Sequence, residues 1–214
     1  MLLSSRKELL LISFFSVMLG VIAGGSLTCW IIGHHSGLAV FLLLLCVFHC
    51  LEFFMAALYQ FEFSADDFLL DNGWEYPAFL LLAPAEHLIL PRVTAFPRLG
   101  LGMALIGQGI RTLAMYCSRE QFAHLLGAAK LEPKLIRTGI YALVRHPSYL
   151  GFFLWSLGLQ LYLGNVFCFC TAVVIMQRFF SERVRVEEAE LIRVFGGEYV
   201  EYRNSVCSGI PGVT

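Results

Sequence analysis

The chain has 214 residues, of which 58% are hydrophobic and 14% are charged, and its formal net charge is -1. Soluble domains carry roughly 25% charged residues. This composition therefore predicts an integral membrane protein and excludes an ordinary soluble domain. Nothing in the charge distribution suggests a nucleic-acid partner.

Three apolar runs are long enough to cross a bilayer, which takes about 20 residues of helix. They cover residues 9–32, 38–61 and 99–117. A fourth run, residues 76–90, reaches only about three-quarters of that length and contains a glutamate, a histidine and two prolines. We expect this fourth segment to be broken, tilted or re-entrant.

The first apolar run has no small-residue cleavage site of the kind that ends a signal peptide, so we interpret it as a retained helix. It contains Gly20 and Gly24, whose spacing lets two membrane helices approach closely. Glycines are common in membrane helices in any case, so a role of this pair in helix packing stays open.

The last apolar stretch, residues 147–180, is too long for one crossing, and Gly164-Asn165 divides it into two shorter runs. A glycine at such a break predicts a turn and therefore a helical hairpin. The whole sequence predicts an all-α, polytopic transmembrane bundle of about five to six membrane helices, with a cytosolic connector before the hairpin and an amphipathic C-terminal tail after it.

Basic residues gather beyond residue 118. The connector 118–146 carries Arg119, Lys130, Lys134, Arg137 and Arg145, which places it in the cytoplasm by the positive-inside rule. The hairpin returns the chain to the same side, so the tail 181–214 shares this compartment. We therefore divide the chain into a membrane scaffold, residues 1–117, and a region that carries the chemistry, residues 118–214.

Several common devices of binding and catalysis are absent from the sequence. The seven cysteines form no CxxC pair, so neither a disulfide framework nor a zinc site is indicated, and we expect no metal. The pair Gly100 and Gly102 lies at the start of an apolar helix rather than after a strand, which excludes a Rossmann nucleotide fold. A metal-free transfer reaction fits these absences better.

A basic and aromatic cluster stands immediately before the hairpin, in the order Arg145-His146-Pro147-Ser148-Tyr149. Proline suits the first turn of a helix. The N–H groups of that turn and the helix dipole favour an anion or a polar ligand near His146 and Tyr149. The same residues would also serve as an anchor at the level of the lipid headgroups, and the residues alone favour neither interpretation.

Four residues of the hairpin recur at helical spacing on one face: Tyr149, Phe153, Ser156 and Gln160. They would place hydroxyl and amide groups inside the membrane. A polar stripe of this kind faces protein or a cavity.

A second charged cluster follows the hairpin and contains Arg183 and Glu187, which share a helix face. A structural ion pair at this spacing is better with the acid first, whereas here the arginine comes first. This order favours separate ligand roles, in which the guanidinium holds a carboxylate and the glutamate holds an ammonium group. A solvated, charged helix end remains the alternative.

Two motifs of the C-terminal region carry a resemblance to a known family. They are Arg145-His-Pro-Ser-Tyr149-Leu-Gly151 and Arg183-Val-Arg-Val-Glu187-Glu188, the second followed by Leu191, Phe195-Gly196, Tyr199 and Tyr202. Together they resemble the isoprenylcysteine carboxyl methyltransferase family over residues 122–212. The His-Pro-x-Tyr element alone looks similar in membrane phospholipid methyltransferases and sterol reductases, so the paired motifs are the more specific signal.

The resemblance implies a role for individual residues. Arg183 would bind the substrate carboxylate and is the implied catalytic residue. The implied ligands of the cofactor, S-adenosylmethionine, are Pro133, Lys134, Leu135, Ile136, Tyr141, His146, Pro147, Ser148, Tyr149 and Glu187. Residues 133–136 match only in their apolar half, since the family commonly has His-Thr-Leu-Val there. Gly127 stands where the family usually has a glutamine, which leaves open what replaces that cofactor contact.

The resemblance also implies a function: methylation of the terminal carboxylate of a prenylated cysteine in proteolytically trimmed CaaX proteins such as small GTPases, giving a methyl ester. The enzyme would lie in the endoplasmic reticulum membrane with its active site facing the cytosol. Its partners would be the prenylated protein and the lipid bilayer, and a homo-oligomer stays open. Two alternatives remain, a phospholipid N-methyltransferase and a non-catalytic membrane scaffold.

Overall fold

The computed structural model describes residues 6–33, 37–60, 63–70, 73, 75–90, 96–122 and 133–213. Within these residues every regular element is helical. The α-helices are α1 (Arg6–Ile31), α2 (Gly37–Tyr59), α3 (Glu75–Ile89), α4 (Pro97–Ser118), α5 (Pro147–Leu163), α6 (Val166–Phe195) and α7 (Gly197–Ser205). Short 3-10 turns lie at η1 (Ala65–Phe68), η2 (Arg119–Gln121) and η3 (Gly139–Ala142). The all-α prediction is confirmed for this part of the chain.

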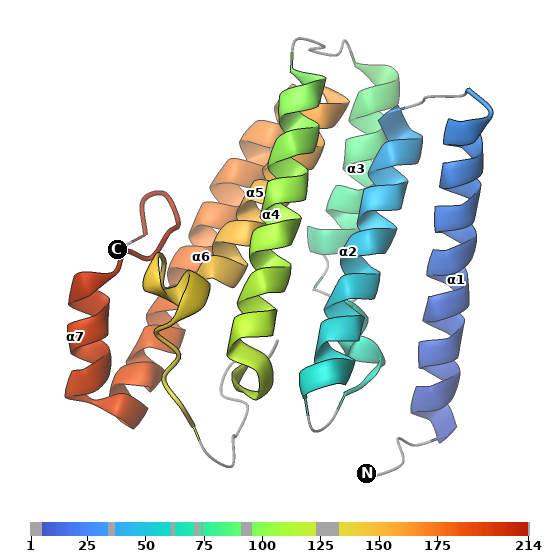
Figure 1. Ribbon diagram of the computed structural model, residues 1–214. Helices are drawn as coiled ribbons and strands as arrows, with labels where there is room; N and C mark the ends of the chain where they lie inside the picture. Colours follow the sequence, from blue (N-terminus) through green and yellow to red (C-terminus); the bar gives the residue numbers. More distant parts are fainter. Residues whose placement is uncertain are drawn as a thin grey trace.

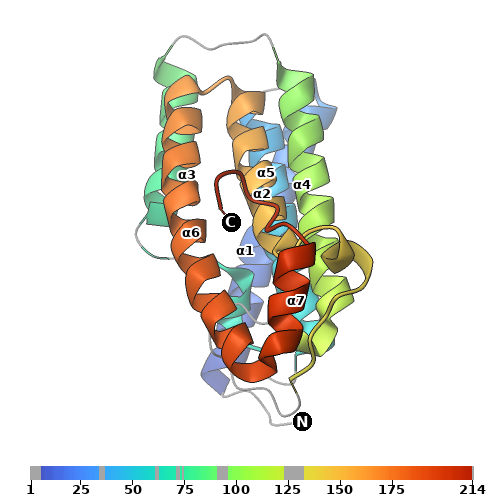
Figure 2. The ribbon, with the colours of Figure 1, turned by 90° about the vertical axis from the view of Figure 1, so that its left-hand side faces the viewer.

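The helices α1 to α6 stand side by side as an elongated bundle (Figure 1), with α1 at one edge and α7 against the lower part of α6. The view turned by 90° places the C-terminal segment in front of α5 and α6 (Figure 2). The start of α1, the end of α4, the start of α5 and α7 all lie toward the lower end in Figure 1. The connector and the tail therefore meet at one end of the bundle.

Two of the described helices, α1 and α2, are long and apolar enough to cross a membrane by length and composition. The predicted hairpin is confirmed, since α5 and α6 are joined at Gly164, which has a φ of 75° that glycine adopts without strain. Of the three possibilities expected for the fourth segment, broken, tilted or re-entrant, the broken helix is wrong. Helix α3 runs without interruption through Pro84.

Glycines bring α4 and α5 into backbone contact. A Cβ atom placed on Gly107 would lie 2.6 Å from the carbonyl oxygen of Gly151, and one on Gly158 would lie 2.4 Å from the backbone nitrogen of Ala104. Small residues, glycine above all, allow membrane helices to approach this closely. By contrast, Gly20 and Gly24 of α1 have no atom within 4 Å of such a Cβ, so this pair packs against nothing in the described chain.

A carboxylate of α3 caps the first turn of α6. Glu86 accepts the N–H groups of Phe167 and Cys168, both at 2.7 Å. Backbone N–H groups at a helix start have no partner within the helix, and a negative charge there also interacts favourably with the helix dipole. The charge that made residues 76–90 a poor membrane segment therefore has a structural use.

Two further contacts complete this junction at the hairpin turn. His87 donates from Nδ1 to the carbonyl of Leu163 at 2.8 Å, and Asn165 donates from Nδ2 to the carbonyl of Ala83 at 2.8 Å. We call the set Glu86, His87 and Asn165 the turn clasp. It fixes α3 to the hairpin at the end of the bundle opposite the connector (Figure 1).

Candidate functional site

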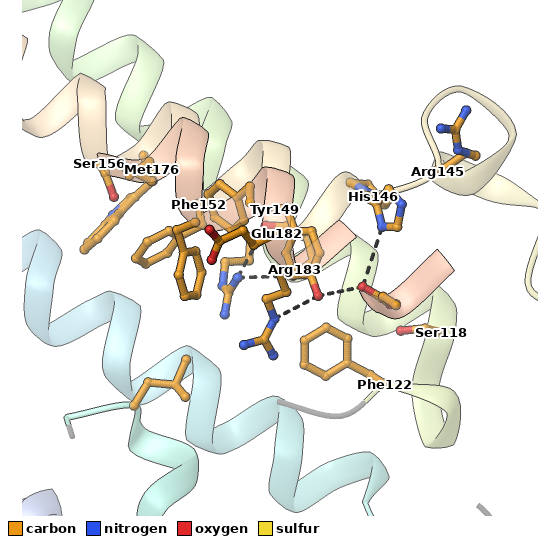
Figure 3. A pocket seen from close by; sticks show the side chains of 18 of the residues that line it. Ser118, Phe122, Arg145, His146, Tyr149, Phe152, Ser156, Met176, Glu182 and Arg183 are labelled. Atoms are coloured by element: carbon orange, nitrogen blue, oxygen red, sulfur yellow. Dashed lines mark hydrogen bonds and ion pairs between the residues drawn. The ribbon is translucent and has the colours of Figure 1, made fainter. Parts of the chain in front are cut away.

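A cavity of about 590 Å³ lies between α2, α3, α4, α5, α6 and the connector (Figure 3). Ten of the eleven residues that the resemblance implied line this cavity: Lys134, Leu135, Ile136, Tyr141, His146, Pro147, Ser148, Tyr149, Arg183 and Glu187. Pro133 is exposed and is not part of the wall. The two motifs, separated by the hairpin in sequence, thus meet around one space.

A chain of hydrogen bonds links the two motifs across α5 and α6. Arg183 donates from Nε to the hydroxyl oxygen of Tyr149 at 3.0 Å, and that hydroxyl donates to Glu187 Oε2 at 2.6 Å. The guanidinium carbon of Arg183 also lies 5.7 Å from the centre of the Tyr149 ring, within the range of a cation–π contact. The spacing of four that suggested separate ligand roles is bridged by this tyrosine (Figure 3).

The imidazole of His146 stacks on Tyr149, with the ring centres 5.5 Å apart and the planes within 5°. Its Nε2 lies 3.0 Å from Glu188 Oε1, and its Nδ1 lies 3.7 Å from Glu187 Oε2. A carboxylate only accepts hydrogen bonds, so Nε2 carries a hydrogen and donates to Glu188. Both ring nitrogens of His146 therefore face carboxylates of α6.

Glu188 is the buried centre of the polar network behind the cavity wall. Besides the hydrogen bond from His146, Glu188 accepts one from Nε of Arg145 at 2.9 Å. It also forms an ion pair with Nε of Arg203 at 3.1 Å. Burial alone would raise the pKa of Glu188, but the hydrogen bond from His146 and the charge of Arg145 outweigh it and hold that pKa below its usual range. Sequence reasoning placed Glu188 in a motif and gave it no role.

The tail closes over this network. The N–H groups of Arg145 and His146 donate to the carbonyls of Cys207 and Ser208 at 2.9 and 3.2 Å. Ile210 is buried against apolar side chains of α5 and α6. The C-terminal segment thereby fixes the start of α5 from outside, which extends the expected amphipathic tail to a structural role.

Helix α7 also holds the connector in place. The hydroxyl of Tyr202 donates to the carbonyl of Tyr141 at 2.6 Å, and burial raises the pKa of Tyr202 to about 12.

Lys134 donates its backbone N–H to the side-chain oxygen of Gln121 at 3.0 Å. The expected glutamine position, Gly127, lies outside the described residues, whereas Gln121 lies on the cavity wall.

An ion pair inside the bundle was missed by sequence reasoning. Arg111 of α4 binds Glu52 of α2 through Nε at 2.5 Å and Nη2 at 2.7 Å, and its Nη1 donates to Ser148 Oγ at 3.1 Å. All three side chains are buried. Such intramembrane charges are costly unless paired. The available signal was a charge in each of two apolar runs, but nothing in the sequence matched the two.

The predicted polar stripe on α5 divides between two surroundings. Tyr149 and Ser156 line the cavity, while Gln160 accepts a hydrogen bond from Asn165 at 2.9 Å beside the turn clasp. Phe153 packs in the core between α5 and α6. The stripe therefore faces the cavity at Tyr149 and Ser156 and packed protein at Phe153 and Gln160.

Comparisons with known proteins agree with the geometry. The sequence profile of the isoprenylcysteine carboxyl methyltransferase family matches residues 100–193. The chain is 34% identical to the protein-S-isoprenylcysteine O-methyltransferase of Saccharomyces cerevisiae, covering 96% of this chain and 92% of the relative. It is 36% identical to that of Schizosaccharomyces pombe, with 92% of each covered, and 35% identical to the human one, with 78% of this chain and 62% of the relative covered.

A solved structure of a eukaryotic intramembrane Ras methyltransferase, an isoprenylcysteine carboxyl methyltransferase, superposes with a TM-score of 0.89 at 28% identity. The match covers 95% of this chain and 77% of that one. The agreement in sequence thus extends to the arrangement of the helices. The chain belongs to the isoprenylcysteine carboxyl methyltransferase family.

Proposed function

We propose that this protein transfers a methyl group from S-adenosylmethionine to the C-terminal carboxylate of a prenylated cysteine, giving a methyl ester. One observation carries the proposal: a single cavity has Arg183, Tyr149 and Glu187 at one end and apolar walls at the other. A substrate with a carboxylate at one end and a long apolar chain attached needs this combination. The names of the relatives support the same reaction.

The polar end of the cavity suits S-adenosylmethionine in charge and shape. Glu187 lies on the wall as a carboxylate that would hold the cofactor's ammonium group. The stacked rings of His146 and Tyr149 offer aromatic surface to a cationic sulfur or a purine. Lys134 and Gln121 come from the connector side, where a water-soluble cofactor would enter. When bound, S-adenosylmethionine supplies a methyl group that is already activated on a positively charged sulfur.

The acceptor needs orientation more than proton transfer. A carboxylate is ionised at neutral pH, so no residue is required to remove a proton from it. The guanidinium of Arg183 would hold it through two parallel hydrogen bonds, while Tyr149 fixes that guanidinium at Nε. Alignment of two reacting groups is a large effect by itself.

Exclusion of water is the second contribution of the protein. Phe152, Phe179 and Phe180 stand beside Arg183 and Tyr149 on the cavity wall. In such surroundings the carboxylate is less hydrated, and electrostatic interactions inside the cavity are stronger. The buried pair of Arg111 and Glu52 anchors the first turn of α5 through Ser148, which keeps His146 and Tyr149 in place.

The arrangement of the chain in the membrane is also part of the proposal. Residues 118–214 carry the chemistry and residues 1–117 form the scaffold. The scaffold contributes Phe41, Tyr76 and Arg111 to the cavity wall. About five to six helices cross the bilayer, and the connector and tail face the cytosol of an endoplasmic reticulum membrane. The partners are prenylated small GTPases, and a homo-oligomer is compatible with the exposed α1.

A methyl-acceptor assay tests the proposal. The purified protein in detergent receives labelled S-adenosylmethionine with either N-acetyl-S-farnesylcysteine or phosphatidylethanolamine. Methylation of the farnesylcysteine alone is expected. Methylation of the phospholipid instead would identify a phospholipid N-methyltransferase. Failure to bind the cofactor in a titration would leave a non-catalytic membrane scaffold.

A further inference from the structure

A second cavity, of about 410 Å³, lies against the side of α6 that faces away from the first cavity. Figure 2 shows the elements that surround it, with α7 and the C-terminal segment beside the lower part of α6. Its volume is within the range of about 300 to 1,000 Å³ that is typical of ligand sites. No described residue lines both cavities. We call the second one the basic groove; it is lined by Ser181, Val184, Arg185, Glu188, Ala189, Ile192, Arg203, Gly212 and Val213.

The basic groove has an excess of positive charge. Glu188 is the only carboxylate among the described residues that line it, and this carboxylate already accepts a hydrogen bond from Arg145 and pairs with Arg203. The guanidinium of Arg185 forms no ion pair or hydrogen bond within the described part of the chain. Three arginines in and beside the groove therefore have one carboxylate between them, and two positive charges remain for an anion.

The two arginines that line the groove suit a phosphate group. A guanidinium has five N–H donors in a planar fork and binds a phosphate through two parallel hydrogen bonds. Arg203 contacts Glu188 through Nε, which leaves its Nη groups for a second acceptor. The side chains of Arg185 and Arg203 are both exposed, so an anion can reach them from outside the protein.

The position of the groove along α6 favours a phosphate that belongs to a lipid. Residues 166–180 are apolar apart from a few polar side chains and a single charge, Arg178. Ser181 follows this apolar part, and Arg185 lies four positions later, which is a rise of about 6 Å. The headgroup layer of a bilayer is about 5 to 8 Å deep on each side of the hydrocarbon. Arg185 therefore lies at the depth of the lipid phosphates if the apolar part of α6 is in the membrane.

An exposed apolar stripe leads from the groove along the apolar part of α6. Phe167, Val174 and Ser181 recur every seven residues and therefore lie on one side of the helix. Phe167 is 75% exposed and Val174 is 52% exposed. An acyl chain can lie along these two side chains while its phosphate is in the groove. A free phosphate ion gains nothing from the stripe.

We propose that the basic groove binds the phosphate of an anionic phospholipid between Arg185 and Arg203, with an acyl chain along Phe167 and Val174. The headgroup then connects α6 with α7 and the C-terminal segment. Because Arg203 also pairs with Glu188, the bound lipid stabilises the polar network behind the first cavity. A zwitterionic lipid binds more weakly, since its headgroup brings a positive charge next to the two arginines.

Thermal unfolding of the full chain in detergent tests the site. The additives are dioleoylphosphatidylglycerol, dioleoylphosphatidylcholine and inorganic phosphate at equal concentrations. At about ten times its dissociation constant, the phosphatidylglycerol should raise the midpoint by about 3 °C or more. The other two should raise it by less than about 1 °C. An equal rise with inorganic phosphate would overturn the lipid as ligand, and an equal rise with phosphatidylcholine would overturn the role of charge.

Two variants locate the effect in the groove. Arg185→Gln should lose at least about half of the rise with phosphatidylglycerol, because one of the two guanidiniums is removed. Ala189→Glu places a carboxylate at an exposed position of the groove wall and should abolish the rise, whereas Ala189→Gln, of similar size and without charge, should retain it. Arg193→Gln is the matched control for net charge, since Arg193 lies on the same helix, pairs with Glu190 and is outside the groove.

Each rise is the difference between the same variant with and without lipid, so a change in the variant's own stability does not enter. An unchanged rise in Arg185→Gln and Ala189→Glu would overturn the groove as the binding site. An equal loss in Arg193→Gln would overturn it as well, because the lipid would then respond to the overall charge of the protein. Loss in the two groove variants, with both controls like wild type, establishes the site.

Discussion

The two ends of the bundle use buried polar residues in different ways. At the hairpin turn, Glu86, His87 and Asn165 bond to backbone groups of other helices. At the connector end, Arg183, Tyr149 and the glutamates of α6 bond mainly to one another around a cavity. Backbone partners are fixed by the helices, whereas side-chain partners can be exchanged for a ligand. The first arrangement favours stability and the second favours binding.

This contrast leads to separable expectations. Substitutions of Arg183 and Glu187, which line the cavity at the connector end, should alter binding and turnover with little effect on unfolding. Substitutions in the turn clasp should lower stability and leave the chemistry of the folded enzyme unchanged. A residue that fails this division would show that the two ends are coupled through α5 and α6.

The largest effect is expected from Arg183→Ala. Two hydrogen bonds from a charged donor to a carboxylate are worth about 3 kcal/mol or more, so kcat/KM for farnesylcysteine should fall at least roughly a hundredfold. Cofactor affinity, measured by titration, should stay within about threefold. Arg193→Ala is the control, because Arg193 pairs with Glu190 on the exposed side of α6. Equal loss of both properties would contradict the assigned role.

Glu187→Ala should have the next largest effect, on the cofactor. Loss of one carboxylate that holds an ammonium group costs about 1.5 to 2 kcal/mol of binding free energy. The dissociation constant of the cofactor should therefore rise roughly tenfold to thirtyfold. Glu187→Gln keeps an acceptor for the Tyr149 hydroxyl and separates the loss of charge from the loss of the hydrogen bond. An unchanged affinity in both variants would remove Glu187 from the cofactor site.

The two ends of the bundle differ in how much of each can be predicted from the sequence. Apolar runs located the helices, and the two motifs with Arg183 and His146 located the cavity, because each feature is local in the chain. The pairing of Arg111 with Glu52 spans 59 positions and leaves no periodic signal. The charge of Glu86 counted against a membrane helix in the sequence. Its partners are N–H groups of a helix 81 positions away, and a local pattern does not reveal them.

Glu86→Ala is expected to break the turn clasp. It leaves the N–H groups of Phe167 and Cys168 without their acceptor, which costs about 1 to 2 kcal/mol of stability. Thermal unfolding in detergent should show a lower midpoint, while kcat/KM per folded enzyme stays unchanged. Glu86→Gln retains one acceptor oxygen, so its unfolding midpoint should lie between those of wild type and Glu86→Ala. A change in acceptor preference without loss of stability would argue against a purely structural clasp.

The smallest effect concerns the pH response of the tail. The pKa of Glu188 is held below its usual range by His146 and Arg145, so its stabilising effect is complete above about pH 5 and is lost as the pH falls below about 4. Wild-type protein should therefore lose thermal stability in that window more steeply than Glu188→Gln, whose side chain does not titrate. Glu190→Gln, on the exposed face of the same helix, should follow wild type. Parallel curves for all three proteins would mean that the carboxylate of Glu188 does not hold the tail against α5.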